Sequence, residues 1–175
     1  MMNYFEFYEL LPTFLLDETD LKKRFLKYSK MFHPDFHTLE SDEAQSEILE
    51  KATFNTEAYK VLQNFDSRMA YILELKGMKK EEGQEKLPQD FLMEMMDINE
   101  TLMDLQFDFD AESFEKVTKE IKKIENDNFF SIKDILQNFD YQQVTNNDLE
   151  KIKFFSLKKK YLLRIQKTCR NFAPH

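Results

Sequence analysis

The chain has 175 residues, enough for one ordinary domain or two small ones, and carries a formal net charge of -8. Hydrophobic residues (42%) can supply a core, while 33% charged residues indicate a soluble protein, and no apolar run approaches the roughly 20 residues of a membrane span. The acidic balance and the lack of a basic stripe with interleaved aromatics argue against nucleic acid as a partner, and the single cysteine excludes an intramolecular disulfide.

Four helices are predicted within the first 75 residues. The segment Tyr4–Leu11 reads as a short apolar helix that Pro12 stops. Asp17 suits the N-cap of a second helix and Ser41 that of a third, with acidic residues in the first turn of each. Residues Ser67–Leu75 are expected to form the fourth. Its inward-facing residues are Met69, Ile72 and Leu73.

The second of these helices is amphipathic, with an apolar face and a basic face. The apolar face consists of Leu21, Phe25, Tyr28 and Phe32, and the basic residues are Lys23, Arg24, Lys27 and Lys30. Part of this order is ordinary helix chemistry, because acids suit the first turn of a helix and bases suit its C-terminal end. In a chain of net charge -8, a contiguous positive surface nevertheless favours an acidic partner.

The triplet His33-Pro34-Asp35 follows this helix directly. Pro34 fixes its own φ and disfavours the helical conformation at His33, so the helix must stop and the imidazole and carboxylate lie on a rigid corner. Taken alone, the triplet fits a simple turn in which Asp35 closes a local hydrogen bond. Between a basic amphipathic helix and a further helix, it becomes a candidate recognition loop.

A linker is predicted where the composition changes. Both glycines of the chain, Gly77 and Gly83, lie in one polar stretch that Pro88 follows. The expected domains are therefore 1–76 and 89–175, joined by a linker over 77–88. Because the N-terminus lacks a basic and then apolar secretory signal, the expected location is the cytoplasm.

The second domain opens with a helix whose apolar residues recur at i, i+4, i+7, i+11 and i+14. This core-facing stripe consists of Phe91, Met95, Ile98, Leu102 and Leu105. At about 100° per residue, three apolar residues and three acids project on the opposite side: Leu92, Met93, Met96, Asp97, Glu100 and Asp104. Apolar side chains rimmed by acids favour a partner surface. The alternative is that Leu92 and Met96 widen the core face or pack on the first domain.

The remaining residues are expected to complete an antiparallel three-helix bundle, so the fold class is all-α. Asp110 suits the N-cap of a helix whose inward residues are Phe114, Val117, Ile121 and Ile124. Residues Ile132–Phe139 read as a further segment. Asn146 or Asn147 opens a final helix that runs to about Arg170.

No catalytic, metal or cofactor site is predicted. His33 and His37 have the i, i+4 spacing of a helical metal pair, but Pro34 breaks the helix that such a pair requires, and no cysteine or third ligand completes a zinc site. There is no glycine-rich phosphate loop, so nucleotide hydrolysis by this chain is not expected. The acidic residues are scattered over helix surfaces, and none of them forms a recognisable catalytic pair.

Several motifs follow one another in the first 75 residues: Asn3-Tyr4-Phe5, Leu10-Leu11-Pro12, Leu21, Arg24-Phe25, Phe32-His33-Pro34-Asp35, Ala52-Thr53-Phe54-Asn55, Ala58-Tyr59-Leu62 and Arg68-Met69-Ala70-Tyr71-Ile72-Leu73. In this order they resemble the J-domain of the HscB family, the DnaJ-type co-chaperones of iron-sulfur cluster biogenesis. The resemblance implies that a DnaK- or HscA-type chaperone is bound, and its ATPase stimulated, by His33, Pro34 and Asp35 together with Lys23, Arg24, Lys27 and Lys30. Two positions depart from the family: Phe36 stands where a basic residue is usual, and Phe65 where proline is common.

The resemblance continues into the second domain. Positions with which HscB-like proteins bind the cluster scaffold protein IscU match Leu92, Met93, Met96, Asp97, Glu100 and Asp104. Phe154 resembles one further contact in the last helix, although Phe155 takes that role if the match shifts by one residue. The implied function is a non-enzymatic adaptor that delivers IscU to the chaperone. The alternative is a general J-protein whose second domain binds unfolded clients or dimerises.

Overall fold

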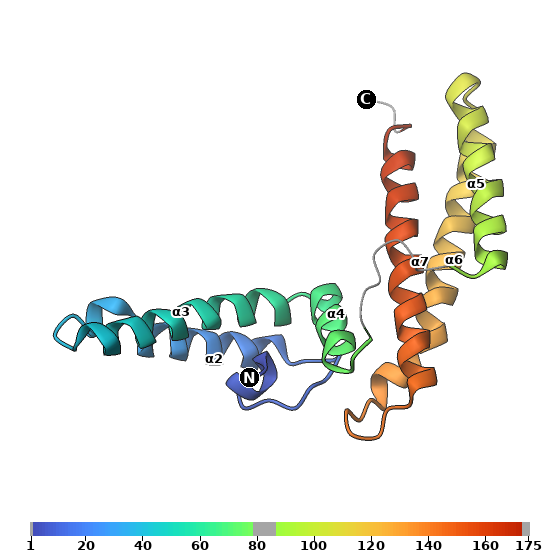
Figure 1. The fold of residues 1–175 in the computed structure, drawn as a ribbon. Helices are drawn as coiled ribbons and strands as arrows, with labels where there is room; N and C mark the ends of the chain where they lie inside the picture. Colours follow the sequence, from blue (N-terminus) through green and yellow to red (C-terminus); the bar gives the residue numbers. More distant parts are fainter. Residues whose placement is uncertain (1, 79–86, 173–175) are drawn as a thin grey trace. The chain divides into compact units, whose positions relative to one another are not determined.

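The computed structural model describes residues 2–78 and 87–172, and within these ranges the chain forms helices and no strand (Figure 1). By backbone proximity, the described residues of Met1–Lys79 group with Phe139–Gln143, and those of Lys80–Asn138 group with Val144–His175. None of the helices in these ranges combines the length and the apolar character that crossing a bilayer requires. Most of the predicted linker lies outside the described residues, and the predicted domain boundaries stay a prediction.

The first unit is built around a helical hairpin. Its elements are α1 (Tyr4–Phe7), α2 (Glu18–Met31), the 3-10 turn η1 (Pro34–Phe36), α3 (Asp42–Leu62) and α4 (Phe65–Leu75). Helices α2 and α3 lie side by side, and α1 and α4 pack on α3 (Figure 1). The fully buried side chains include Phe5, Tyr8, Phe14, Leu21, Leu62, Met69 and Ile72. Met69 and Ile72 were predicted to face inward, and they do.

The helix starts in this unit follow from their caps. Asp17 and Ser41 cap α2 and α3, as predicted, through side-chain oxygens that accept backbone N–H groups of the first turn. Helix α4 begins at Phe65 instead of at Ser67, because Asn64 accepts two backbone N–H groups and supplies an earlier cap.

The prediction of a helix over Tyr4–Leu11 is wrong at its C-terminal end, since α1 stops at Phe7. Glu9 takes a φ of 55°, and the N–H groups of Glu9 and Leu10 donate back to carbonyls of the helix over 3.0 and 2.9 Å. This bond pattern is a Schellman motif, which closes a helix through a residue in the left-handed conformation. Pro12 therefore lies beyond the helix and does not stop it.

A buried polar link fixes the end of α1 against the hairpin. The Tyr8 hydroxyl donates to Asn55 Oδ1 over 2.7 Å, and Asn55 Nδ2 donates to Ser29 Oγ over 3.0 Å. Tyr8 and Asn55 are 0% and 1% exposed, and burial raises the pKa of the Tyr8 hydroxyl. Hydrogen bonds as well as apolar contacts therefore set how α1, α2 and α3 meet.

The second unit contains the bundle helices α5 (Gln89–Phe107), α6 (Ala111–Gln137) and α7 (Asn146–Arg170) (Figure 1). The predicted stripe of α5 is confirmed, because all five of its residues are at most 4% exposed. They pack on the start of α6 and the end of α7, where the buried partners are Val117, Ile121, Ile124, Leu162 and Ile165. Asp110 caps α6 as predicted, while Thr145 caps α7. The two long helices are antiparallel.

The prediction of a separate segment over Ile132–Phe139 is wrong, because α6 runs without a break to Gln137. Asn128 lies on its buried face, 8% exposed, and Nδ2 donates to the Phe155 carbonyl of α7 over 3.2 Å. A polar residue at a core position is therefore satisfied by the neighbouring helix and does not interrupt α6.

Candidate functional site

The triplet His33-Pro34-Asp35 lies on the corner between α2 and α3. Phe32 closes α2, His33 is extended with φ -73° and ψ 124°, and Pro34 opens the turn η1. The Asp35 N–H donates to Nδ1 of His33 over 3.3 Å, and Asp35 Oδ2 lies 3.7 Å from the same nitrogen, so the hydrogen bond within the turn comes from the backbone of Asp35. The side chains of His33 and Asp35 are 51% and 83% exposed, which leaves both available to a partner.

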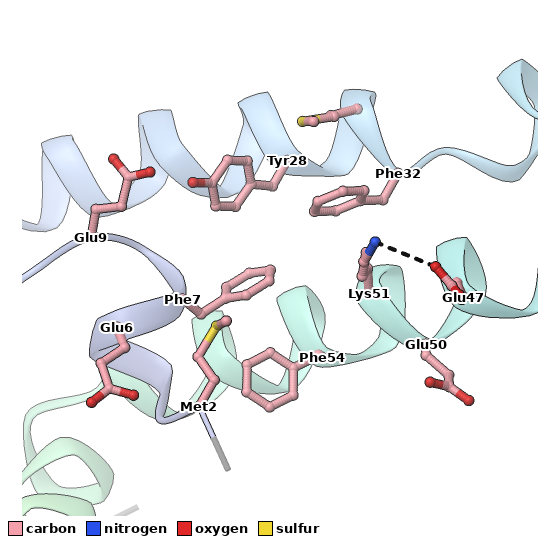
Figure 2. A pocket seen from close by; sticks show the side chains of 11 residues that line it. Met2, Glu6, Phe7, Glu9, Tyr28, Phe32, Glu47, Glu50, Lys51 and Phe54 are labelled. Atoms are coloured by element: carbon pink, nitrogen blue, oxygen red, sulfur yellow. Dashed lines mark ion pairs between the residues drawn. The ribbon is translucent and has the colours of Figure 1, made fainter. Parts of the chain in front are cut away.

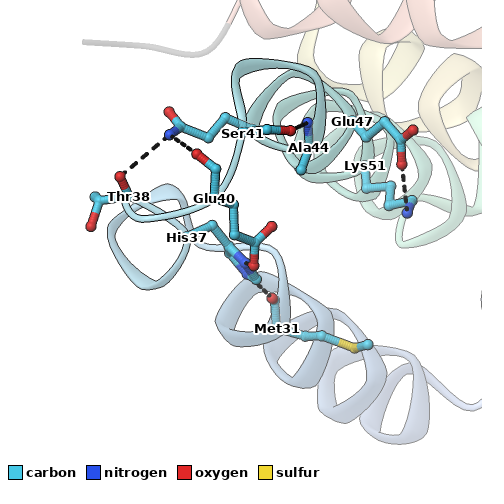
Figure 3. A network of polar contacts seen from close by, with 9 residues as sticks. Met31, His37, Thr38, Glu40, Ser41, Ala44, Glu47 and Lys51 are labelled. Atoms are coloured by element: carbon cyan, nitrogen blue, oxygen red, sulfur yellow. Dashed lines mark hydrogen bonds and ion pairs between the residues drawn. The ribbon is translucent and has the colours of Figure 1, made fainter.

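A second set of hydrogen bonds holds this corner closed (Figure 3). His37 Nε2 lies 2.8 Å from the Met31 carbonyl oxygen, and Nδ1 lies 2.7 Å from Glu40 Oε1. Gln45 Nε2, in the first turn of α3, donates to the carbonyls of Glu40 and Thr38 over 3.0 and 3.4 Å. Both ring nitrogens donate only when the ring is protonated, and the bonds to Glu40 and then to Met31 raise the pKa of His37. We name these bonds of His37 the latch.

The predicted basic residues separate into two groups in the structure. Lys23, Lys27 and Lys30 are exposed along α2, and no ion pair involves them among the described residues. Arg24 points elsewhere: its Nε donates to Asp20 Oδ2 over 2.8 Å, and its guanidinium also donates to a carbonyl at the end of α1 over 2.7 Å. Arg24 thus ties α2 to α1, and the basic surface consists of the three lysines.

The side of α5 opposite its core stripe exposes the six residues predicted for it, which we name the α5 face: Leu92, Met93, Met96, Asp97, Glu100 and Asp104. Met93 and Met96 are 60% and 69% exposed, and Leu92 is 38% exposed. Within the second unit, Met96 therefore does not widen the core. Asp97 also lines a polar hollow between α5 and α6, so it lies at the margin of the face.

Two apolar residues extend the α5 face and were not predicted. Met103 and Phe107 are 60% and 87% exposed towards the C-terminal end of the helix. They follow Met96 by seven and eleven residues, the helical spacing that also marks the core stripe. The sequence therefore contained the signal for both.

Phe154 and Phe155 occupy different environments. Phe155 is 5% exposed in the bundle core, with its ring 6.5 Å from the ring of Phe129, whereas Phe154 is 38% exposed. Phe154 shares a helix face with Lys158, one turn further on, whose Nζ lies 5.2 Å from the Phe91 ring. The residue one turn after Phe154 thus reaches the first turn of α5, and Phe154 itself is partly exposed on α7.

Within residues 2–78 and 87–172, no three His, Cys, Asp or Glu side chains gather as a metal ion would require. The latch engages both ring nitrogens of His37. Burial raises the pKa of the Cys169 thiol, which disfavours a reactive thiolate. The candidate sites among the described residues are therefore three exposed surfaces: the His33-Pro34-Asp35 corner, the basic surface and the α5 face.

Comparison with known proteins adds a family. Residues 87–170 match the family model described as the HSCB C-terminal oligomerisation domain. The Co-chaperone protein HscB homolog of Vibrio vulnificus strain YJ016 is 32% identical over 158 residues, 89% of this chain and 91% of that protein. The iron-sulfur cluster co-chaperone protein HscB of Mus musculus is 30% identical over 165 residues, 94% of this chain and 66% of that protein.

Two solved structures share the fold. The human co-chaperone protein HscB superposes with a TM-score of 0.70 at 22% identity, covering 96% of this chain and 80% of that one. The chaperone HscB from Vibrio cholerae gives 0.59 at 24% identity, covering 96% and 99%. The predicted all-α fold, an N-terminal J-domain followed by a helical bundle, is confirmed.

Proposed function

Because the chain belongs to the HscB family of co-chaperones, we propose that it acts in iron-sulfur cluster biogenesis as an adaptor with two binding surfaces. The His33-Pro34-Asp35 corner and the basic surface engage a DnaK- or HscA-type chaperone. The α5 face, with Phe154, binds the scaffold protein IscU. Catalysis belongs to the chaperone, whose ATPase the adaptor stimulates.

The observation that carries the scaffold half of the proposal is the α5 face itself. Its helix already buries a complete apolar stripe, so the exposed Met93 and Met96 are not needed for folding of the bundle. Methionine side chains adapt to the shape of a protein ligand, and the acids around them orient a partner that carries basic residues. The partly exposed Phe154 of α7 adds an aromatic side chain that can serve as an anchor.

The chaperone half rests on shape and charge. Asp35 is held on a corner that α2, η1 and the latch fix, so little conformational entropy is lost when a partner captures its carboxylate. The basic surface attracts an acidic ATPase domain over the Debye length of roughly 8 Å at physiological ionic strength. Preferential binding to the hydrolysing conformation is how such a ligand raises ATP turnover.

The test of the chaperone half is an ATPase assay with the purified chaperone and IscU. Asp35→Asn is expected to abolish stimulation and leave the melting temperature unchanged, since the side chain is 83% exposed. Asp134→Asn, the same substitution at an exposed position of α6, is the matched control and is expected to stimulate normally. Normal stimulation by Asp35→Asn would remove the corner from the proposal.

The test of the scaffold half replaces Leu92, Met93 and Met96 together by alanine. Anchors of this kind commonly contribute about 2 kcal/mol, so scaffold affinity is expected to fall about 30-fold while stimulation without scaffold persists. A loss of affinity that follows a loss of helix content would show that these residues stabilise the bundle instead.

The description of the matched family model as an oligomerisation domain favours one alternative. In it, the chain is a general J-protein whose second domain dimerises or binds unfolded clients. Sedimentation and a pull-down from the native host distinguish the two functions. A monomer that captures one scaffold and one chaperone supports the adaptor, whereas a dimer or a broad set of clients supports the alternative.

A further inference from the structure

A groove of about 780 Å³ opens between α1, α2 and α3 of the first unit (Figure 2). Its volume falls in the range of about 300–1,000 Å³ that is usual for ligand sites. Neither the three lysines of the basic surface nor the His33-Pro34-Asp35 corner lines it. The proposed function therefore assigns this groove no role.

The floor of the groove is aromatic. Phe7 lies between Phe54 and Tyr28, with ring centroids 5.0 and 5.2 Å apart, and Phe32 follows at 5.6 Å from Tyr28 (Figure 2). None of these four rings is fully buried, unlike the neighbouring Tyr8, so part of each remains open to a ligand. The floor offers apolar and π surface.

Two methionines with flexible, apolar side chains lie at the edge of the groove. Met2 and Met31 are 58% and 57% exposed, and both line the groove. Unbranched methionine side chains can close over ligands of different shape. An occupant with two or three apolar side chains would therefore find a floor and two adjustable walls.

The rim is acidic on both banks. Glu6 and Glu9 come from the α1 side, and Glu47 and Glu50 from α3 (Figure 2). Lys51 is the only basic residue in the lining, and its Nζ lies 3.9 Å from Glu47 Oε2. The rim thus keeps an excess of negative charge, opposite in sign to the basic surface of α2.

We propose that this groove binds a basic amphipathic segment of a partner protein. Apolar side chains of the segment insert among the aromatic rings. Lys or Arg residues at the two ends of the segment form ion pairs with the glutamates on the α1 side and the α3 side of the groove. Along α3 the lining extends from Glu47 to Phe54, a rise of about 10 Å or two helical turns, which suits a short helix better than a single small cation. The partner is distinct in chemistry from the acidic ATPase surface that the basic surface attracts.

The test uses the full chain and a fluorescent synthetic peptide of about 14 residues, four helical turns, with leucines on one face and lysines on its flanks. One control peptide replaces the leucines by serine, and another replaces the lysines by glutamate. In fluorescence anisotropy the first peptide is expected to bind about tenfold or more tightly than either control. Equal binding of the serine peptide would show attraction by charge alone and overturn the proposal.

Charge reversal of the rim locates the site. Glu9→Lys/Glu50→Lys is expected to weaken the peptide about tenfold. The double variant Glu74→Lys/Glu120→Lys makes the same change in net charge at exposed positions outside the groove and is expected to have a much smaller effect. Equal effects of both double variants would overturn the proposal, provided that thermal melts show both to be folded.

A second matched pair tests the apolar contact. Met31→Ala removes a side chain at the edge of the groove, and Leu26→Ala removes a side chain of similar exposure, 55%, from another face of α2. Only Met31→Ala is expected to weaken the leucine peptide. If the peptide does not bind, and the chain instead self-associates in a way that Glu9→Lys/Glu50→Lys abolishes, the occupant is a second copy and the proposal is wrong.

Discussion

Alanine in place of Phe154 or Phe155 removes the same atoms from neighbouring positions of α7, and the two variants are expected to fail in different ways. Phe155 is 5% exposed, so Phe155→Ala loses a complete burial and leaves a cavity, at about 3–5 kcal/mol of unfolding free energy. Phe154 is 38% exposed, so roughly six tenths of the 1.5–3 kcal/mol of complete burial is lost, about 1–2 kcal/mol with no enclosed cavity.

These free energies translate into melting temperatures. In a chain of this size each kcal/mol lowers Tm by about 2–4 °C, so Phe155→Ala is expected to melt about 6–20 °C below the wild type and Phe154→Ala about 2–8 °C below it. Thermal unfolding followed by far-ultraviolet circular dichroism measures both. The order of the two values is the structural part of the prediction.

Scaffold affinity is expected to follow the opposite order. By calorimetry with purified IscU, Phe154→Ala is expected to bind about 30-fold more weakly, the effect of a 2 kcal/mol anchor. Phe155→Ala, measured well below its Tm, is expected to bind as the wild type does. A folded Phe155→Ala that loses affinity, beside a Phe154→Ala that keeps it, would refute the reasoning from exposure.

Three further predictions concern the first unit. The pKa of His37 is raised in the folded chain, so the latch stabilises the fold fully below the unfolded pKa of about 6.5 and ceases to do so as pH rises through the folded pKa. The Tm difference between wild type and His37→Gln should therefore shrink from about pH 6 to about pH 8.5. A Tm difference that stays constant over this range would contradict the prediction. Tyr8→Phe leaves Asn55 Oδ1 without its buried donor and is expected to cost about 1–3 kcal/mol in urea unfolding, where no change would show that the bond is dispensable. Chaperone affinity is expected to weaken as ionic strength rises to 0.15 M, where the Debye length is about 8 Å, and Lys27→Ala is expected to reduce that dependence; an affinity independent of salt would remove the basic surface from the chaperone contact.

The features that were predicted correctly depend only on residues within a single helix. The α5 stripe could be read from spacing alone, because a helix that buries one face needs an apolar residue every three or four positions. Asp17 and Ser41 could be assigned as caps because their side chains satisfy N–H groups within the same turn. Neither inference required knowledge of another element.

Where the prediction failed, the deciding partner lay far away in the sequence. Helix α1 ends before Pro12. The Tyr8 hydroxyl donates a hydrogen bond to Asn55, and the Tyr8 carbonyl accepts one from Arg24, so both groups of this residue bind distant parts of the chain. Helix α6 continues through Asn128 because α7 supplies an acceptor for its amide. The spacing of apolar residues along the chain does not reveal hydrogen bonds between residues that are far apart in the sequence.

The candidate site shows the same division. Exposure of the α5 face followed from helical geometry, but the difference in exposure between Phe154 and Phe155 depends on the packing of α6 on α7. Likewise the spacing of Arg24 places it with the lysines, and only the position of α1 shows that its guanidinium is engaged. The latch could not be foreseen, since His37 reads as a loop residue until the end of α2 is brought beside it.

Under the proposed function, weak binding at each of two surfaces is enough to bring scaffold and chaperone together, because one chain carries both surfaces. Exposed lysines such as those of the basic surface typically contribute only about 0–1 kcal/mol per ion pair, so the chaperone contact alone is weak and sensitive to salt. A scaffold held on the α5 face nevertheless meets the chaperone within one complex, at an effective concentration well above its concentration in solution. Even a weak scaffold–chaperone contact then becomes populated. Loss of either surface removes this gain entirely, because the other surface alone brings nothing into proximity.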